Sequence, residues 1–181
     1  MTLPASRVAI SFRSLVSSEV TKYESYLGFF FSRLINTPPG AKQTVKGDCP
    51  VYTTRRIVSL FGHYHAHTTR FSVWNERGSS RELVYESYNW EEPGTLQYDS
   101  LTPNVKPDPK AGTVGGHNGI LTIKPHDNIH FECEIDNTTN ATLKNGNEVF
   151  TAEMCNLFGT FESPNPSGWG CAPPRPATPA P

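Results

Sequence analysis

Short segments with the alternating polarity of β-strands, separated by turn residues, recur along this 181-residue chain. In residues 7–13, for example, Val8, Ile10 and Phe12 are every second residue, as in a strand with one buried face. The turn signals are Thr37-Pro38-Pro39-Gly40, Glu92-Pro93-Gly94, Gly115-Gly116 and Asn145-Gly146. Many short strands with turns at this spacing predict an all-β fold, an antiparallel β-sandwich of jelly-roll-like arrangement.

The predicted strands are residues 7–13, 20–35, 56–74, 82–90, 119–124, 129–136 and 155–161. Segment 20–35 is aromatic-rich and mixed in period, so a strand is favoured there and a helix is the alternative. Segment 56–74 is the longest, and apolar residues at both odd and even positions predict burial of both faces. We expect residues 6–171 to form one domain. The proline-rich residues 172–181 predict an extended or disordered tail.

Charge and hydropathy exclude two kinds of partner. Sixteen basic and seventeen acidic residues give a net charge of -1, and no run of like charges stands out. Nucleic acid is therefore not an expected partner. The longest apolar stretch, residues 26–31, is far shorter than the roughly 20 residues of a membrane helix, so no membrane span is expected. The first residues also lack the apolar centre of a signal peptide.

Four cysteines, Cys49, Cys133, Cys155 and Cys171, are scattered along the chain without a Cys-x-x-Cys pair. This spacing argues against a zinc knuckle or a thioredoxin-like motif. Two disulfides are the favoured interpretation. The alternative is four buried free thiols in a cytosolic protein, because an even number of cysteines alone is weak support for oxidation.

His63, His65 and His67 occupy alternate positions inside the predicted strand 56–74. An extended strand would direct all three imidazoles to one face, with neighbouring Cα atoms roughly 6.6 Å apart. Two such rings can converge on one metal ion. The alternative is a polar sheet face on which the histidines are incidental.

Met154 is the only methionine besides Met1. Its ordinary role would be to fill a gap in the core. As a ligand, a thioether together with two imidazoles suits copper, including Cu(I), better than zinc, magnesium or calcium. Strand alternation predicts that Met154, Asn156 and Phe158 share one face and that Cys155 lies on the other.

Other polar residues carry weaker predictions. We expect His117, His126 and His130 at surface or turn positions, outside any metal site. Asn137 and Asn140 each begin a glycosylation sequon, which matters only if the source glycosylates secreted proteins. Glu153 is expected to be a solvated surface group, and a supporting base beside the metal is the alternative.

Three features in order carry a resemblance to a known family. They are a Pro38-Pro39 turn followed by Cys49, the His-x-His of His65 and His67, and Glu-Met-Cys-Asn-Leu at residues 153–157. Residues 8–171 resemble the second copper domain of the copper type II, ascorbate-dependent monooxygenases. This is the family of peptidylglycine alpha-hydroxylating monooxygenase and dopamine beta-monooxygenase.

The resemblance implies a ligand set and a disulfide pattern. His65, His67 and Met154 would hold the oxygen-binding copper, with a fourth position open for water or dioxygen. Cys133 would pair with Cys155, and Cys49 with Cys171. Such bridges imply an oxidising compartment, so we expect a secreted, periplasmic or cell-surface protein.

The substrate contacts depart from the family's pattern. His63 stands where the peptide enzymes carry an arginine that pairs with the substrate carboxylate, and Phe158 replaces a tyrosine, whereas Asn156 matches. An imidazole and a phenyl ring cannot form the bidentate clamp of a guanidinium. His63, Asn156 and Phe158 are therefore the expected substrate-binding residues, for a small substrate other than a peptidylglycine.

The function implied is copper-dependent activation of dioxygen for C–H hydroxylation, with ascorbate or another reductant. The chain is too short for the preceding, histidine-bound copper domain of the family, so an electron-donor domain or protein is an expected partner. The alternatives are a non-enzymatic copper domain for storage, delivery or sensing, and an interaction module in which the histidines are incidental.

Overall fold

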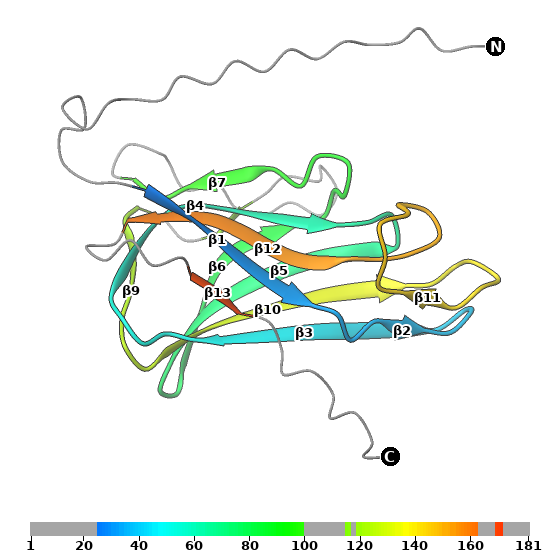
Figure 1. Cartoon of the computed structure of the whole chain (residues 1–181), viewed down its shortest axis with the longest axis horizontal. Coiled ribbons are helices and arrows are strands. Elements are labelled where there is room, and N and C mark those ends of the chain that lie inside the picture. The colour runs from blue at the N-terminus through cyan, green and yellow to red at the C-terminus, as the bar shows by residue number, and fades with distance from the viewer. Residues whose placement is uncertain (1–24, 100–114, 117–118, 163–168, 172–181) are drawn as a thin grey trace, which may run out of the picture.

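The structure, a computed structural model, describes residues 25–99, 115–116, 119–162 and 169–171, the last of these as backbone only (Figure 1). The predicted β-sandwich is confirmed, and the described residues contain no helix. The strand predicted at residues 7–13 and the tail at 172–181 lie outside the described residues, as does His117.

Two sheets form the sandwich. The six-stranded sheet has the order β13-β1-β12-β4-β7, with β9 also paired to β4. Its strands are β1 (Ser25–Ser32), β4 (Arg55–Tyr64), β7 (Thr95–Gln97), β9 (Leu121–Ile123), β12 (Cys155–Glu162) and β13 (Trp169–Cys171). All pairs in this sheet are antiparallel except β1 with β13.

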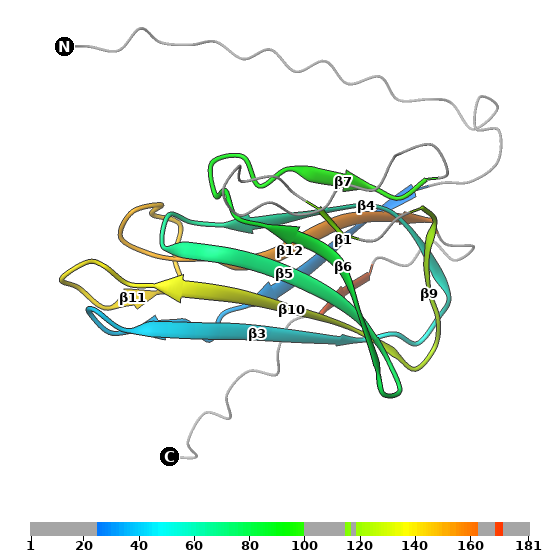
Figure 2. The ribbon, with the colours of Figure 1, turned by 180° about the vertical axis from the view of Figure 1, so that it is seen from behind.

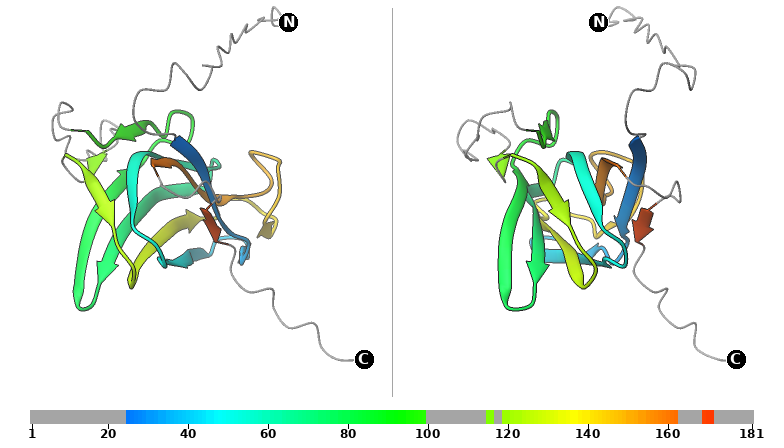
Figure 3. Two further views of the ribbon diagram at one scale, coloured as in Figure 1. Left: turned by 60° about the vertical axis from the view of Figure 1, so that its left-hand side comes forward. Right: turned by 90° about the vertical axis from the view of Figure 1, so that its left-hand side faces the viewer.

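The five-stranded sheet has the order β3-β10-β5-β6-β8 and is wholly antiparallel. Its strands are β3 (Lys42–Pro50), β10 (Asp127–Asp136), β5 (Thr68–Arg77), β6 (Ser80–Ser87) and β8 (Gly115–Gly116). A small ribbon pairs β2 (Asn36–Thr37) with β11 (Leu143–Lys144). Figure 2 shows β3, β10, β5 and β6 side by side, and Figure 3 shows the two layers.

The core lies between the sheets because alternate residues of the strands are apolar and buried. Its largest fully buried apolar side chains are Phe30, Tyr64, Phe71, Tyr85, Tyr98, Phe131, Phe161, Ile123, Ile135, Leu143 and Leu157. Packing is also close within one sheet: a Cβ on Gly47 of β3 would lie 2.2 Å from the ring of Phe131, the residue that it faces on β10. Ring packing of this density leaves room for glycine alone at that position.

A disulfide crosses this core. Cys133 of β10 and Cys155 of β12 are bonded, with their Cα atoms 5.9 Å apart, so the bridge joins the two sheets as predicted. Cys49 is also disulfide-bonded. Its predicted partner, Cys171, belongs to β13, whose side chains lie outside the described structure, so the Cys49–Cys171 pairing stays a prediction. The bridge indicates an oxidising compartment.

Most strand predictions are confirmed, including the strand rather than the helix in segment 20–35, where β1 forms. The prediction of one strand over residues 56–74 is wrong. The segment is two strands, β4 in one sheet and β5 in the other, joined by a turn at residues 65–67. Apolar residues at odd and even positions reflect two strands that face one core from opposite sides. No helix in the described part of the chain has the length and apolar character needed to cross a membrane.

Candidate metal centre

The turn that carries the histidine motif takes the chain from one sheet to the other. The Thr68 amide donates to the His65 carbonyl at 3.1 Å and closes the turn. His63 remains in β4, whereas His65 and His67 lie in the turn. The three imidazoles are therefore not spaced along one extended strand. Within the described residues, the three rings do not offer nitrogens that all lie within 4.8 Å of one another.

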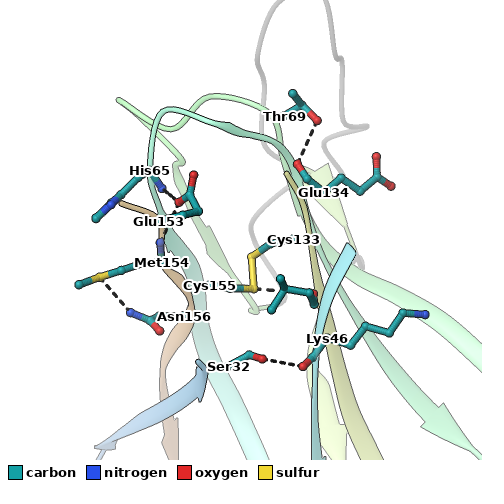
Figure 4. The surroundings of a disulfide bond; sticks show 11 residues. Ser32, Lys46, His65, Thr69, Cys133, Glu134, Glu153, Met154, Cys155 and Asn156 are labelled. Atoms are coloured by element: carbon teal, nitrogen blue, oxygen red, sulfur yellow. Dashed lines mark hydrogen bonds between the residues drawn. A yellow bond between two sulfur atoms is a disulfide. The ribbon is translucent and has the colours of Figure 1, made fainter. Parts of the chain in front are cut away.

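Glu153 connects the three predicted copper ligands through their backbones. Its side chain is 0% exposed. One carboxylate oxygen accepts from the amides of His65 at 2.5 Å and Met154 at 2.8 Å (Figure 4). The other accepts from the amide of His67 at 3.1 Å. The expectation of a solvated Glu153 is wrong, because its partners are backbone donors that residue types do not reveal.

Burial raises the pKa of Glu153, and the amide hydrogen bonds from Met154 and His65 offset only part of this effect. An ionised carboxylate with several N–H donors is a strong acceptor, so it fixes the turn against the start of β12. The candidate ligands are therefore held by a buried polar contact rather than by exposed loops.

Ring hydrogen bonds determine which nitrogen each histidine of the turn can offer. His65 is buried, and its Nδ1 lies 3.2 Å from the carbonyl of Ala152. A carbonyl only accepts, so Nδ1 carries the proton and Nε2 keeps its lone pair. His67 is half-buried, and its two ring nitrogens have the opposite roles. Nε2 donates to the Phe150 carbonyl at 3.0 Å, which leaves Nδ1 available as a ligand.

His63 lies beside the His65 ring, with 5.6 Å between their centroids. It faces Asn156 across the β4–β12 pair. Loss of solvent around its ring lowers the pKa of His63, and charge on His65 would lower it further. His63 is thus a neutral imidazole next to the candidate ligands, a position that suits either a substrate contact or an additional nitrogen ligand.

Met154 is half-buried and accepts a hydrogen bond at Sδ from the Asn156 amide, at 3.4 Å. Tyr64 of β4 faces Cys155 of β12, and His65 and Met154 are the next residues beyond this pair. Figure 4 shows both side chains extending to the same side of the sheet, with Asn156 below them. Cys155 points into the core, so the predicted alternation of faces is confirmed.

This donor set fits copper. It offers imidazole nitrogens and a thioether, the soft and borderline ligands that Cu(I) prefers. No carboxylate among the described residues is hydrogen-bonded to the rings of His63, His65 or His67. Hard cations such as magnesium and calcium prefer oxygen ligands, so the imidazoles and the thioether favour a softer ion.

An array of aromatic rings extends from His63 over the outer face of the six-stranded sheet. Phe158, a predicted substrate residue, is at its centre, 5.9 Å from the His63 ring and 5.3 Å from the Phe61 ring. Phe29 and Phe31 of β1 lie against its other side, at 5.4 and 6.1 Å. The three predicted substrate residues, His63, Asn156 and Phe158, therefore share one face with Met154.

A cluster of one histidine, His130, and several carboxylates lies on the five-stranded sheet and was not predicted. His130 is only 8% exposed, so its predicted surface or turn position is wrong. Its Nδ1 is 2.7 Å from Asp48 and its Nε2 is 2.8 Å from Glu132. Asp48, Glu76 and His130 also place one ligand atom each within 4.8 Å of one another. Alternating charged residues on β3 and β10 were the available signal.

His126 does lie in a turn, with a left-handed φ of 72°. Asn137 is fully buried and donates to the carbonyls of Thr37, Pro38 and Ala141. Its amide nitrogen is therefore occupied in the fold, and of the two sequon asparagines only Asn140 is exposed.

Comparison of the chain with protein-family models and with curated protein sequences finds no match.

Proposed function

We propose that this domain binds one copper ion through His65, His67 and Met154 and uses dioxygen to hydroxylate a C–H bond of a small substrate. One oxygen atom would enter the C–H bond and the other would leave as water, with two electrons from ascorbate or another reductant. A separate electron-donor domain or protein would deliver these electrons. The disulfide agrees with a secreted, periplasmic or cell-surface location.

The observation that carries this proposal is the buried Glu153 carboxylate, which binds the backbone amides of all three proposed ligands. A buried carboxylate is costly unless its hydrogen bonds are satisfied. Such a contact pre-organises two segments that are 86 residues or more apart in sequence. A metal site of defined geometry requires ligands whose backbones are held in place by neighbouring groups, as Glu153 holds these three.

Copper bound there would supply the one-electron chemistry that dioxygen activation needs. His65 would bind through Nε2, because its Nδ1 is held by Ala152. Met154 would bind through Sδ, which the Asn156 amide orients. His67 would bind through Nδ1 while Nε2 holds Phe150. His63 and Phe158 would form the side of the site that excludes water from the substrate.

The first test is Cu(I) affinity, measured by competition with a Cu(I) chelator. Met154→Leu keeps the volume of the side chain and removes the sulfur, so Cu(I) affinity should fall on the order of 100-fold, about 2.8 kcal/mol, while Cu(II) affinity changes little. His65→Ala should weaken both oxidation states. His126→Asn is the control, because asparagine accepts the left-handed backbone of that turn.

Unchanged Cu(I) binding in Met154→Leu would contradict the proposed ligand set. The second test is oxygen uptake by the copper-loaded protein with ascorbate, with and without candidate substrates. A protein that binds copper through Met154 and yet consumes no oxygen with any reductant would remove the monooxygenase half of the proposal.

A further inference from the structure

We propose that the hollow beside His63 binds an uncharged, apolar ring or chain, and that this is the part of the substrate held next to the metal centre. This inference deepens the proposed function: the bound molecule is a substrate only if the domain is the proposed monooxygenase. The hollow is lined by Leu27, Phe29, Phe61, His63 and Phe158.

The hollow has the size of a small molecule. Its volume is about 330 Å³, within the range of pockets that bind small ligands. Leu27 and Phe29 remain 47% and 39% exposed at its β1 side. Both come from a strand whose odd-numbered residues face outward, so the sheet itself generates the apolar lining.

Ring packing makes the floor of the hollow rigid. Phe158 contacts Phe29 edge-on at 5.4 Å and stacks near Phe61 at 5.3 Å. Each ring is thus held by a neighbour from an adjacent strand. A pre-formed aromatic surface binds an apolar group with little loss of side-chain freedom.

The hollow is continuous with the candidate metal centre. His63 lines the hollow and its ring is 5.6 Å from that of His65. Phe158 and Asn156 are alternate residues of β12, and Asn156 contacts the Met154 sulfur. A molecule on the rings therefore has one edge beside the residues proposed to hold copper. This continuity favours a substrate over an unrelated ligand.

Charge defines the class of molecule. The lining contains no carboxylate, lysine or arginine. Arg33 lies over Phe31 at 5.9 Å from its ring centroid and is not among the lining residues. Burying an ion against these rings would cost its hydration without a counter-charge. The occupant is therefore neutral where it contacts the rings.

Fluorine NMR titrations of the full chain, with its disulfides intact and without copper, test this proposal with three probes of matched size. They are 4-fluoroanisole, which is neutral, 4-fluorobenzoate, an anion, and 4-fluorobenzylammonium, a cation. We expect saturable binding of the neutral probe alone. Phe29→Ser should weaken it on the order of tenfold through lost apolar contact. Tyr52→Ser, at a residue that is 82% exposed elsewhere, should not.

Three results would overturn the inference. The first is tighter binding of 4-fluorobenzoate that Arg33→Gln removes, which would indicate an acid-binding site. The second is equal binding by Phe29→Ser and the unsubstituted protein. The third is self-association in sedimentation experiments that Phe29→Ser abolishes, which would place a second copy on the rings. Because the probes are titrated without copper, neutral-probe binding with no copper affinity would refute only the proposed function.

Discussion

The histidines of the turn, His65 and His67, and the histidine of the five-stranded sheet, His130, differ in what their rings contact. His65 and His67 each donate one ring proton to a backbone carbonyl and keep a free lone pair. His130 has carboxylate oxygens at both ring nitrogens. Both ring nitrogens of His130 are therefore engaged by carboxylates, whereas the rings of the turn are hydrogen-bonded to carbonyls.

The partners of a histidine ring, rather than the spacing of the histidines in the sequence, determine what the ring can bind. A ring with one carbonyl partner has its second nitrogen available beside a thioether, which suits a soft metal ion. Carboxylate partners form ion pairs that stabilise the sheet. Lys46 and Arg81 also contact Glu132, so the His130 cluster is a network of charges. We interpret that cluster as structural.

One strand connects the two regions. β10 carries both His130 and Cys133, and Cys133 is bonded to Cys155, the residue after Met154. The sulfur proposed to bind copper is thus anchored to the sheet that holds the His130 network. The disulfide, the Glu153 carboxylate and the pH dependence of stability each test how far the two regions depend on each other.

The largest effect is expected from removing the disulfide. A Cys133→Ala, Cys155→Ala double variant should lose about 3 kcal/mol of stability, because the unfolded chain gains freedom. Chemical denaturation measures this loss. If the bridge also positions Met154, Cu(I) affinity should fall while amide exchange near His130 stays slow. Equal loosening of both regions would contradict an anchoring role specific to Met154.

Glu153→Gln should lower the free energy of unfolding by about 2 kcal/mol. The carboxylate accepts from three backbone amides, and the NH₂ group of glutamine cannot accept, so a buried polar group is left unsatisfied. Cu(I) affinity should fall about 10- to 100-fold, the scale seen when a support of a metal ligand is lost. Glu148→Gln, at an exposed residue near the same turn, is the matched control. A variant that loses stability but keeps full copper affinity would show that Glu153 serves the fold alone.

The two regions should respond to pH with opposite signs. Despite the opposing effect of burial, hydrogen bonds from His130 lower the pKa of both Asp48 and Glu132 in the folded state. These carboxylates therefore stabilise the fold above their ordinary values of 3.8 and 4.5, and the contribution is lost as pH falls through the folded values. His130→Gln should reduce this acid-side loss in denaturation measured from pH 5 down to about pH 2.

Glu153 should give the opposite slope. Its folded pKa is raised above the ordinary 4.5, so its contribution to stability falls as pH rises from 4.5 through the folded value. Glu153→Gln should remove this slope and leave the acid-side loss of the His130 cluster unchanged. A Glu153→Gln variant with the unsubstituted pH profile would contradict a raised pKa.

The smallest effect concerns modification. In a host that glycosylates secreted proteins, a glycan should be added at Asn140 of the folded chain, and Asn140→Gln should remove it with little change in stability. Asn137→Gln should leave the glycan in place and destabilise the turn whose carbonyls Asn137 binds. Both asparagines lie on one tryptic peptide, residues 111–144, so fragmentation mass spectrometry that locates the glycan distinguishes the two sites. A glycan at Asn137 would contradict its burial.

The sequence predicted the strands and their faces well, but it predicted the turns and the contacts between distant segments less well. Alternation placed Met154 and Asn156 on one face and Cys155 on the other, because side-chain direction in a strand is a local property. It did not show that residues 65–67 turn, since His65-Ala66-His67 contains none of the glycine, proline, asparagine or aspartate residues that mark turns. Nor did it predict the burial of Glu153 and His130, whose partners come from distant segments.

The amino-acid sequence by itself determined the β class, the soft donor types at His65, His67 and Met154, and the outward and inward faces of each strand. These follow from residue chemistry and a two-residue period. Only the tertiary structure decided that Glu153 binds the amides of all three candidate ligands and that His130 lies between two carboxylates. Hydrogen bonds between segments many residues apart depend on how the sheets pack, which no local pattern encodes.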